Sequence, residues 1–223
     1  MNIETNPLAH PIILESVGRP VPSNHHIFDT PHTVLLLGQK RCGKTNWCLN
    51  ALKNPLLYNQ YFTNICVFSP NNDQFDKSVI DNQNYVFSTF TDDKLASCIQ
   101  LAVDNKEEGD NCGQCFETLI IIDDAMGSDV IKSKHFKALM SRHRNINLSI
   151  WLAIQDLIEV STRLRGLFDN VICWKPLNSD LQHIAKGLET TKWPKEELIK
   201  LFKSPSLYTD PHDFLCFNKS SQA

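Results

Sequence analysis

Residues Thr33 to Thr45 read T-V-L-L-L-G-Q-K-R-C-G-K-T, and this stretch decides the fold. Its first part, Val34 to Leu37, has the length and apolar composition of a strand buried on both faces. It passes directly into the pattern Gly38-x-x-x-x-Gly43-Lys44-Thr45, and residues 46–52 can continue as a helix. This is the strand–loop–helix context that a phosphate-binding loop needs. We therefore predict a P-loop here.

Each part of this loop has an expected role in binding ATP. Two glycines allow backbone angles and a close approach that a Cβ would obstruct, so successive N–H groups can turn toward an anion at a helix N-terminus. Lys44 is expected to reach the β- and γ-phosphates, and the Thr45 hydroxyl to ligate Mg²⁺. The predicted nucleotide-binding residues form one run: Gly38, Gln39, Lys40, Arg41, Cys42, Gly43, Lys44, Thr45 and Asn46.

The size and composition of the chain favour one α/β domain. It has 223 residues, a net charge of −3 and a sequence pI near 6.2, so no global basic field indicates nucleic acid. We predict an extended arm over residues 1–31, which contain five prolines, an ATPase domain over 32–217 and a polar tail over 218–223. No long apolar run or secretory leader is evident, which predicts an intracellular protein without a membrane span.

The eight cysteines are expected to be reduced thiols in an intracellular compartment. Cys48, Cys66 and Cys173 lie in apolar runs and are interpreted as small core residues. The C-x-x-C over residues 112–115 is interpreted as part of a loop rather than a zinc or redox site. Cys42 lies beside Arg41 inside the P-loop, a cationic setting expected to favour the thiolate.

The rest of the chain alternates between buried strands and helices. Further strands are expected at 12–14, 65–68, 85–87, 118–122, 148–154, 170–175 and 214–217. Helices are expected at 92–104, 131–141, 179–187 (closed by Gly187) and 196–203, and a surface loop at 105–115. The fold class is thus α/β, with a mostly parallel sheet between helices.

Polar side chains follow two of these strands where ligands bind in open α/β sheets. Asp123 and Asp124 come directly after the apolar run Thr118–Ile122, in the form of a Walker B strand. Asp123 is expected to hold Mg²⁺ opposite Thr45, and Asp124 to orient or deprotonate the attacking water. Gln155 follows the strand 148–154 and is interpreted as the γ-phosphate sensor, because its amide can donate to phosphate and accept from water.

In this order, the P-loop, Asp123-Asp124, Arg142-His143, Gln155 and Arg165 resemble the genome-packaging ATPases of large DNA viruses. The similarity is greatest to the poxvirus-type branch of the FtsK–HerA superfamily, also found in virophages and Polinton/Maverick elements, and it covers residues 30 to 217. The resemblance implies a RecA-like ASCE ATPase that forms a hexameric ring and pumps double-stranded DNA into a preformed viral capsid. It places such a protein in the host cytoplasm, a virus factory or the virion.

The sequence departs from this family pattern at the acid, where Asp124 replaces the common glutamate. A ring ATPase also needs a positive group from a neighbouring subunit, and Arg142 and Arg165 are the preferred candidates, with Arg144 and Arg163 as alternatives. Because the net charge is acidic, DNA contact is expected to depend on local groups facing a pore. The candidates are Lys132, Lys134 and Lys137.

Two other functions remain compatible with a P-loop. One is a kinase for a small metabolite or nucleotide, but the sequence contains no arginine-rich lid. The other is a nucleotide-dependent switch with little turnover, which Asp124 in place of glutamate leaves open. The carboxylate pair and Gln155 favour hydrolysis over both.

Overall fold

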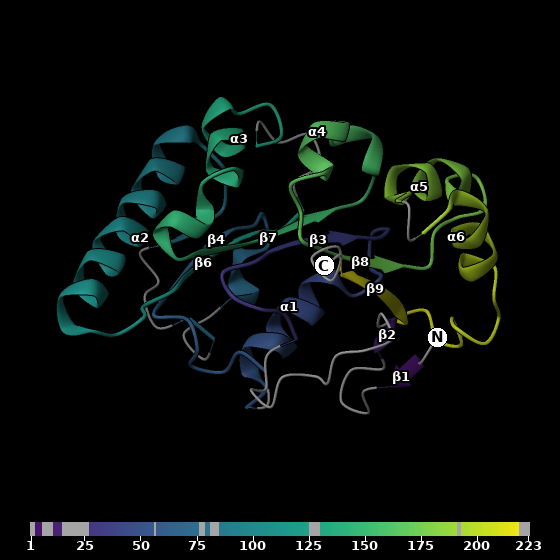
Figure 1. The fold of residues 1–223 in the computed structure, drawn as a ribbon, viewed down its shortest axis with the longest axis horizontal. Coiled ribbons are helices and arrows are strands. Elements are labelled where there is room, and N and C mark those ends of the chain that lie inside the picture. The colour runs from purple at the N-terminus through teal and green to yellow at the C-terminus, as the bar shows by residue number, and fades with distance from the viewer. Residues whose placement is uncertain are drawn as a thin grey trace.

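A computed structural model of the chain describes residues 3–5, 11–14, 27–55, 57–75, 79–80, 85–124, 130–190 and 193–218. In these ranges nine strands form one sheet in the order β1-β2-β9-β8-β3-β7-β6-β4-β5. Helices cover both faces of this sheet (Figure 1). The α/β class expected from the sequence is therefore confirmed.

The elements lie as follows in the chain. The strands are β1 (Ile3–Thr5), β2 (Pro11–Leu14), β3 (Thr33–Leu37), β4 (Asn64–Phe68), β5 (Val86–Phe87), β6 (Thr118–Ile122), β7 (Leu148–Ile154), β8 (Asn170–Trp174) and β9 (Phe214–Asn218). The α-helices are α1 (Lys44–Lys53), α2 (Asp92–Cys112), α3 (Lys134–Met140), α4 (Thr162–Arg165), α5 (Leu181–Leu188) and α6 (Lys195–Phe202). Short 3-10 helices are η1 (Asn72–Gln74), η3 (His143–Ile146) and η4 (Leu157–Glu159).

The order of the parallel strands determines where the functional side chains meet. Strands β8, β3, β7, β6, β4 and β5 are parallel, with β7 lying between β3 and β6. Their carboxyl ends share one edge of the sheet, so the segments that follow β3, β6 and β7 are neighbours there. This is the RecA-like arrangement. Strand β9 is antiparallel to β8 and therefore begins at the same edge.

The alternation of side chains along β3 separates two cores. Leu35 and Leu37 pack on the side that α2, α3, α4, α5 and α6 cover. Val34 and Leu36 pack on the other side, where Trp47 of α1 lies. In Figure 1, α1 lies on one face of the sheet and the other labelled helices lie on the opposite face. Burial on both faces explains why β3 is an unbroken apolar run.

The strands between β3 and β9 begin and end within one residue of the predicted positions. The predicted end of α2 was wrong, because this helix continues through most of the expected loop to Cys112. Its last turns lack apolar periodicity but are held by polar contacts: Asn105 Nδ2 donates to Thr118 Oγ1 at 2.7 Å, and Lys106 pairs with Asp110. The helix ends at Gly113, which has a left-handed φ of 70°.

Two other helix bounds also differ from the prediction. Helix α3 begins only after Ser133, whose hydroxyl accepts from the Phe136 N–H and caps the helix. Gly187 does not close α5 but lies inside it. A Cβ at Gly187 would lie 2.3 Å from Leu157 Cδ2 and 2.8 Å from an Arg165 nitrogen, so the side chains of Leu157 and Arg165 pack directly on the glycine. Its role is helix contact rather than helix termination.

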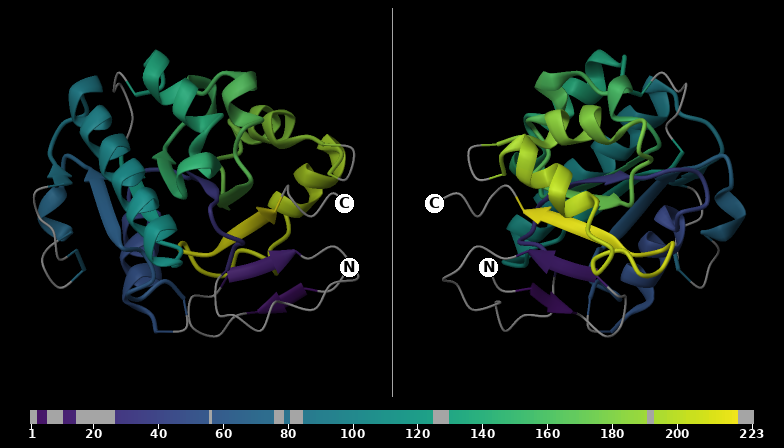
Figure 2. Two further views of the ribbon diagram at one scale, coloured as in Figure 1. Left: turned by 60° about the vertical axis from the view of Figure 1, so that its left-hand side comes forward. Right: turned by 90° about the vertical axis from the view of Figure 1, so that its right-hand side faces the viewer.

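Part of the predicted arm joins the sheet. Strand β2 pairs with β9, and β1 pairs with β2, so the expected strand at 12–14 is present and an additional one precedes it (Figure 2). The other arm residues up to 26, and residues 219–223 of the predicted tail, lie outside the described ranges. The boundary at residue 31 stays a prediction. Among the described residues, no helix has the length and apolarity to cross a membrane.

Candidate active site

The P-loop between β3 and α1 is tightly packed around its glycines. A Cβ on Gly38 would lie 2.6 Å from Cys42 Sγ and 2.9 Å from Trp174 Cβ, so only glycine fits. Gly43 has φ 110° and Arg41 has φ 67°, both left-handed. The Gly38 N–H donates to the Ile154 carbonyl at 3.2 Å, which fixes the start of the loop to the end of β7. This geometry suits an anion cradle at the N-terminus of α1.

Lys44 is buried at the base of this loop, with 7% of its surface exposed. Its ammonium donates to the carbonyl of Gly38, and to that of Gln39 at 2.8 Å. The charge is therefore held over the loop, where phosphate oxygens would be recognised. The phosphate-binding role of Lys44 stays a prediction.

Thr45 and Asp123 meet across the strands as the sequence predicted. The Thr45 hydroxyl donates to Asp123 Oδ2 at 2.7 Å, and the buried Ser69 lies with its Oγ 3.4 Å from the same oxygen. Burial raises the pKa of Asp123, and the charge of Asp124 adds to this, while the bond from Thr45 opposes it. A buried carboxylate beside a hydroxyl supplies the oxygen ligands that Mg²⁺ prefers, so these residues fit a magnesium ion.

Asp124 and Gln155 also form a pair. Gln155 Nε2 donates to Asp124 Oδ1 at 2.8 Å, which joins the end of β7 to the end of β6. Asp124 has a left-handed φ of 52°, so the chain turns sharply directly after Asp123. The two carboxylates can thus face different partners, Asp123 toward Thr45 and Asp124 toward Gln155.

The thiol of Cys42 does not have the thiolate character expected from its neighbours. Burial raises its pKa, and the nearby Lys44 ammonium only partly offsets that effect. The expectation failed because the sequence shows the cationic neighbours but not the burial. Cys42 is a packing residue whose Sγ lies against Gly38.

His212, in the segment before β9, also contacts the P-loop. It lies two residues before β9, and its Nδ1 is 2.9 Å from the Cys42 carbonyl oxygen. Because a carbonyl oxygen only accepts, Nδ1 must carry the hydrogen and donate it. A Cβ on Gly43 would lie 3.3 Å from the same ring nitrogen. The imidazole therefore rests directly on the loop.

The candidate arginines occupy different ends of the fold. Arg142 is exposed and precedes β7, so the length of that seven-residue strand, about 20 Å, separates it from Gln155. Arg165 lies in α4, beyond the carboxyl end of β7, and its Nε donates to the Val160 carbonyl at 2.6 Å. Arg142 is thus not brought to the nucleotide site of its own subunit, whereas Arg165 lies on the same side of the sheet edge as Gln155.

His143 and Arg144 have structural partners around Asp169. His143 is buried, and burial lowers the pKa of its imidazole. Its Nε2 lies 3.9 Å from Asp169 Oδ2, and Arg144 donates to the other oxygen of Asp169 at 2.5 Å. Asp169 also accepts from the Thr33 N–H at 3.0 Å. This cluster anchors the beginning of β3 rather than the nucleotide site.

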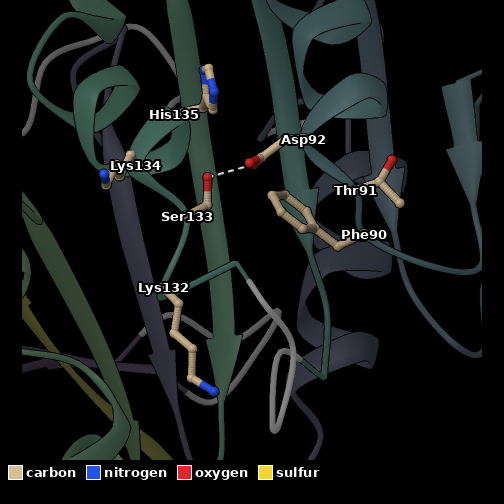
Figure 3. A pocket seen from close by; sticks show the side chains of 7 residues that line it. All are labelled: Phe90, Thr91, Asp92, Lys132, Ser133, Lys134 and His135. Carbon is tan, nitrogen blue, oxygen red and sulfur yellow. Dashed lines mark hydrogen bonds between the residues drawn. The ribbon is translucent and has the colours of Figure 1, made fainter.

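A cavity of about 530 Å³ opens between the first turns of α2 and α3. Lys132, Lys134 and His135 line it from one side and Phe90, Thr91 and Asp92 from the other (Figure 3). At its centre Ser133 Oγ donates to Asp92 Oδ1 at 2.6 Å. The two lysines are exposed and point away from this bond. Lys132 and Lys134, which the sequence suggested as DNA contacts, therefore share a solvent-accessible surface.

Sequence reasoning missed Ser69 and His212. Ser69 directly follows β4, and the rule that polar residues gather at the carboxyl ends of parallel strands would have found it. His212 carries no such signal, because it precedes its strand in the sequence. It reaches the site only because β9 runs antiparallel to β8.

Comparisons with known proteins support the same architecture. The B204 genome packaging NTPase of Sulfolobus turreted icosahedral virus 2 is similar in its complex with AMP (TM-score 0.60, 16% identity) and with AMPPCP (TM-score 0.59, 18% identity). Each match covers 88% of this chain and 96% of that chain. No curated protein sequence matches significantly. The family model described as "Poxvirus A32 protein" matches residues 23–206. The chain belongs to the poxvirus A32 protein family.

Proposed function

We propose that this protein is the ATP-hydrolysing motor that translocates double-stranded DNA into a viral capsid. Membership of the poxvirus A32 family and similarity to a genome packaging NTPase support a genome-packaging ATPase. The observation that carries the proposal is the pair of contacts at the sheet edge, Thr45 to Asp123 at 2.7 Å and Gln155 to Asp124 at 2.8 Å. Together these pairs would bring magnesium binding and water activation into one site beside the P-loop.

The chemistry follows from the places of these side chains. Lys44 would neutralise the β- and γ-phosphates, and one N–H of Gln155 would donate to the γ-phosphate while the other stays on Asp124. Asp124 would accept the proton of the attacking water, whose oxygen bonds to the γ-phosphorus as the bond to the β–γ bridging oxygen breaks. The products are ADP and inorganic phosphate.

Thr45 and Asp123 would hold the Mg²⁺ ion, which supplies charge neutralisation to the phosphates when it is bound. The proposed mechanism also needs a ring of identical subunits. The transferring phosphoryl group requires a positive group, which Arg165 or Arg142 of a neighbouring subunit would provide. We propose a hexamer that acts on the capsid inside the infected cell.

DNA contact is proposed at the surface formed by Lys132, Lys134 and Lys137. All three are exposed, and the first two line the cavity beside α3. This segment follows β6, so it is continuous in the chain with Asp123 and Asp124. DNA bound at this surface would therefore be coupled mechanically to the state of the nucleotide.

The first test is steady-state ATP hydrolysis by the purified protein, with and without linear double-stranded DNA, at low salt and several protein concentrations. We expect turnover to rise with DNA and with protein concentration, and to vanish in Lys44→Ala. The double variant Lys132→Ala/Lys134→Ala should bind DNA more weakly, with the slope of log affinity against log salt reduced by about 2.

The matched control removes the same charge elsewhere. Lys186→Ala/Lys200→Ala changes exposed lysines on α5 and α6, away from α3 in Figure 1, and should leave DNA binding unchanged. If hydrolysis depends on Lys44 but ignores DNA at every concentration, the motor proposal is wrong. Equal effects of the two double variants would reject the assigned DNA surface alone.

A further inference from the structure

We propose that His212, together with Leu177, contacts the base of the bound nucleotide. This inference rests on the proposed ATPase function and deepens it, because it assigns the nucleoside end of the site. Both residues lie in the segment between β8 and β9, outside the P-loop pattern.

The direction of the bound nucleotide follows from the strand order. The γ-phosphate end is defined by Asp123, Asp124 and Gln155, which follow β6 and β7 on one side of β3. On the other side of β3 lie β8 and then β9. A triphosphate wrapped by the P-loop with its γ end toward β7 therefore directs its nucleoside toward β8 and β9.

His212 is placed where that nucleoside would leave the loop. Its Nδ1 donates to the Cys42 carbonyl at 2.9 Å, which holds an exposed ring beside Gly43. In the neutral ring, this hydrogen bond leaves Nε2 as an acceptor. A planar ring with an acceptor on its outer edge can stack on a base or accept from an exocyclic amino group.

The loop that carries His212 is itself well ordered by hydrogen bonds. The buried carboxylate of Asp213 accepts from the Thr209 N–H at 2.8 Å, the Thr209 hydroxyl at 3.0 Å and the Asp210 N–H at 2.8 Å. Asp210 in turn accepts from the His212 N–H at 2.8 Å. These bonds position an exposed imidazole before any ligand arrives, which lowers the entropic cost of binding.

Leu177 supplies an apolar group at the same end of the sheet. It lies three residues beyond Trp174, whose partner across the antiparallel pair is Phe214, two residues after His212. Its side chain is 52% exposed, which is unusual for a leucine in the described part of this chain. Among the described residues, Ile158 is the other large apolar residue exposed to this degree, at 63%, but it follows β7 on the γ-phosphate side.

A different role for His212 would be to brace the P-loop without touching the base. The two roles separate when the ligand lacks a nucleoside. If His212 only supports the P-loop, its loss weakens the binding of ATP and of inorganic tripolyphosphate equally. A base contact concerns ATP alone, since tripolyphosphate presents only the phosphate chain.

The experiment measures dissociation constants of Mg-ATP and Mg-tripolyphosphate for the full chain by competition against a fluorescent ATP analogue. We expect His212→Ala to raise the dissociation constant of ATP about tenfold, the usual effect of losing one base contact, and that of tripolyphosphate less than twofold. Leu177→Ala should act in the same direction with a smaller effect. Ile158→Ala is the matched control and should leave both constants unchanged.

Equal weakening of both ligands in His212→Ala would overturn the inference in favour of the brace, and so would unchanged ATP affinity. These results leave the proposed ATPase intact. If the wild type binds neither ligand, the proposed function fails and this inference fails with it. The same follows if Lys44→Ala binds both ligands as tightly as the wild type does. The two failures are therefore distinguishable.

Discussion

Among single residues, Asp124 carries the greatest departure from the family pattern. An aspartate reaches less far than a glutamate, so the backbone must bring it closer to the γ-phosphate. Its left-handed φ of 52° provides such a turn, and Gln155 Nε2 holds its carboxylate at 2.8 Å. We infer that the turn and the amide together replace the missing methylene. The short acid is then compatible with hydrolysis.

Asp124→Asn tests this role with little disturbance of the backbone, because asparagine tolerates the left-handed region. Its amide oxygen can still accept from Gln155, but it cannot take a proton from water. We expect turnover to fall at least about 100-fold while ATP affinity changes less than about threefold. Steady-state hydrolysis and equilibrium ATP binding measure the two quantities. Turnover within a factor of about 3 of the wild type would show that Asp124 is not the base.

Helix α4 presents two arginines in different surroundings. Arg165 is half-buried, is fixed through its Nε to the Val160 carbonyl, and packs against Gly187 of α5. Burial lowers the pKa of its guanidinium, and Asp156 partly offsets this. Arg163 is exposed. A guanidinium that is held in one orientation loses less entropy when it meets a phosphate, which favours Arg165 as the group supplied to a neighbouring subunit.

Mixing wild-type protein with Arg165→Ala subunits tests this assignment. An arginine acting across an interface disables the neighbour's site, so we expect ATPase activity to fall more steeply than the mutant fraction. The pure variant should lose at least about 100-fold. Arg163→Ala is the matched control on the same helix and should retain activity. A loss strictly proportional to the fraction of Arg165→Ala subunits would count against the role in trans.

At the scale of the whole molecule, the sequence predicted the sheet better than its surroundings. The strands are apolar runs buried on both faces, and this property is visible in the residues themselves, as in β3 and β7. The P-loop, Asp123, Asp124 and Gln155 follow from those strands because parallel carboxyl ends share an edge. The site was thus predictable to the extent that parallel strands build it.

What could not be predicted depends on contacts between distant segments. The last turns of α2 are stabilised by Asn105 on Thr118 rather than by apolar periodicity. Gly187 lies inside α5, where Leu157 occupies the space that a Cβ would take. His212 reaches the P-loop through the antiparallel turn into β9. Each of these features needs the three-dimensional neighbour, which no local pattern contains.

A polar network crosses the amino-terminal edge of the sheet, opposite the P-loop. Glu117 is 3% exposed and accepts from the Ser149 hydroxyl and, at 3.1 Å, from the Tyr61 hydroxyl. Tyr61 also lies 2.5 Å from Thr30 Oγ1, and Ser149 accepts from the His32 N–H at 3.0 Å. The network joins the segment before β3 to β6 and β7. Burial raises the pKa of Glu117, which these hydrogen bonds only partly offset.

This raised pKa makes the stability of the fold depend on pH. Its contribution is fully present below the unfolded value of 4.5 and is lost as the pH rises through the higher folded pKa. Glu117→Gln has no charge to bury, and its amide can accept from Ser149 and donate to Tyr61. We therefore expect the melting temperature of Glu117→Gln minus that of the wild type to increase with pH. At pH 8 the variant should melt at least about 2 °C higher than the wild type. Thermal unfolding from pH 4 to 8 measures this difference, and Glu107→Gln, exposed on α2, should show none. A difference that stays flat with pH would mean that folding leaves the pKa of Glu117 unshifted, and a difference that falls with pH would mean that the network stabilises Glu117 as a carboxylate.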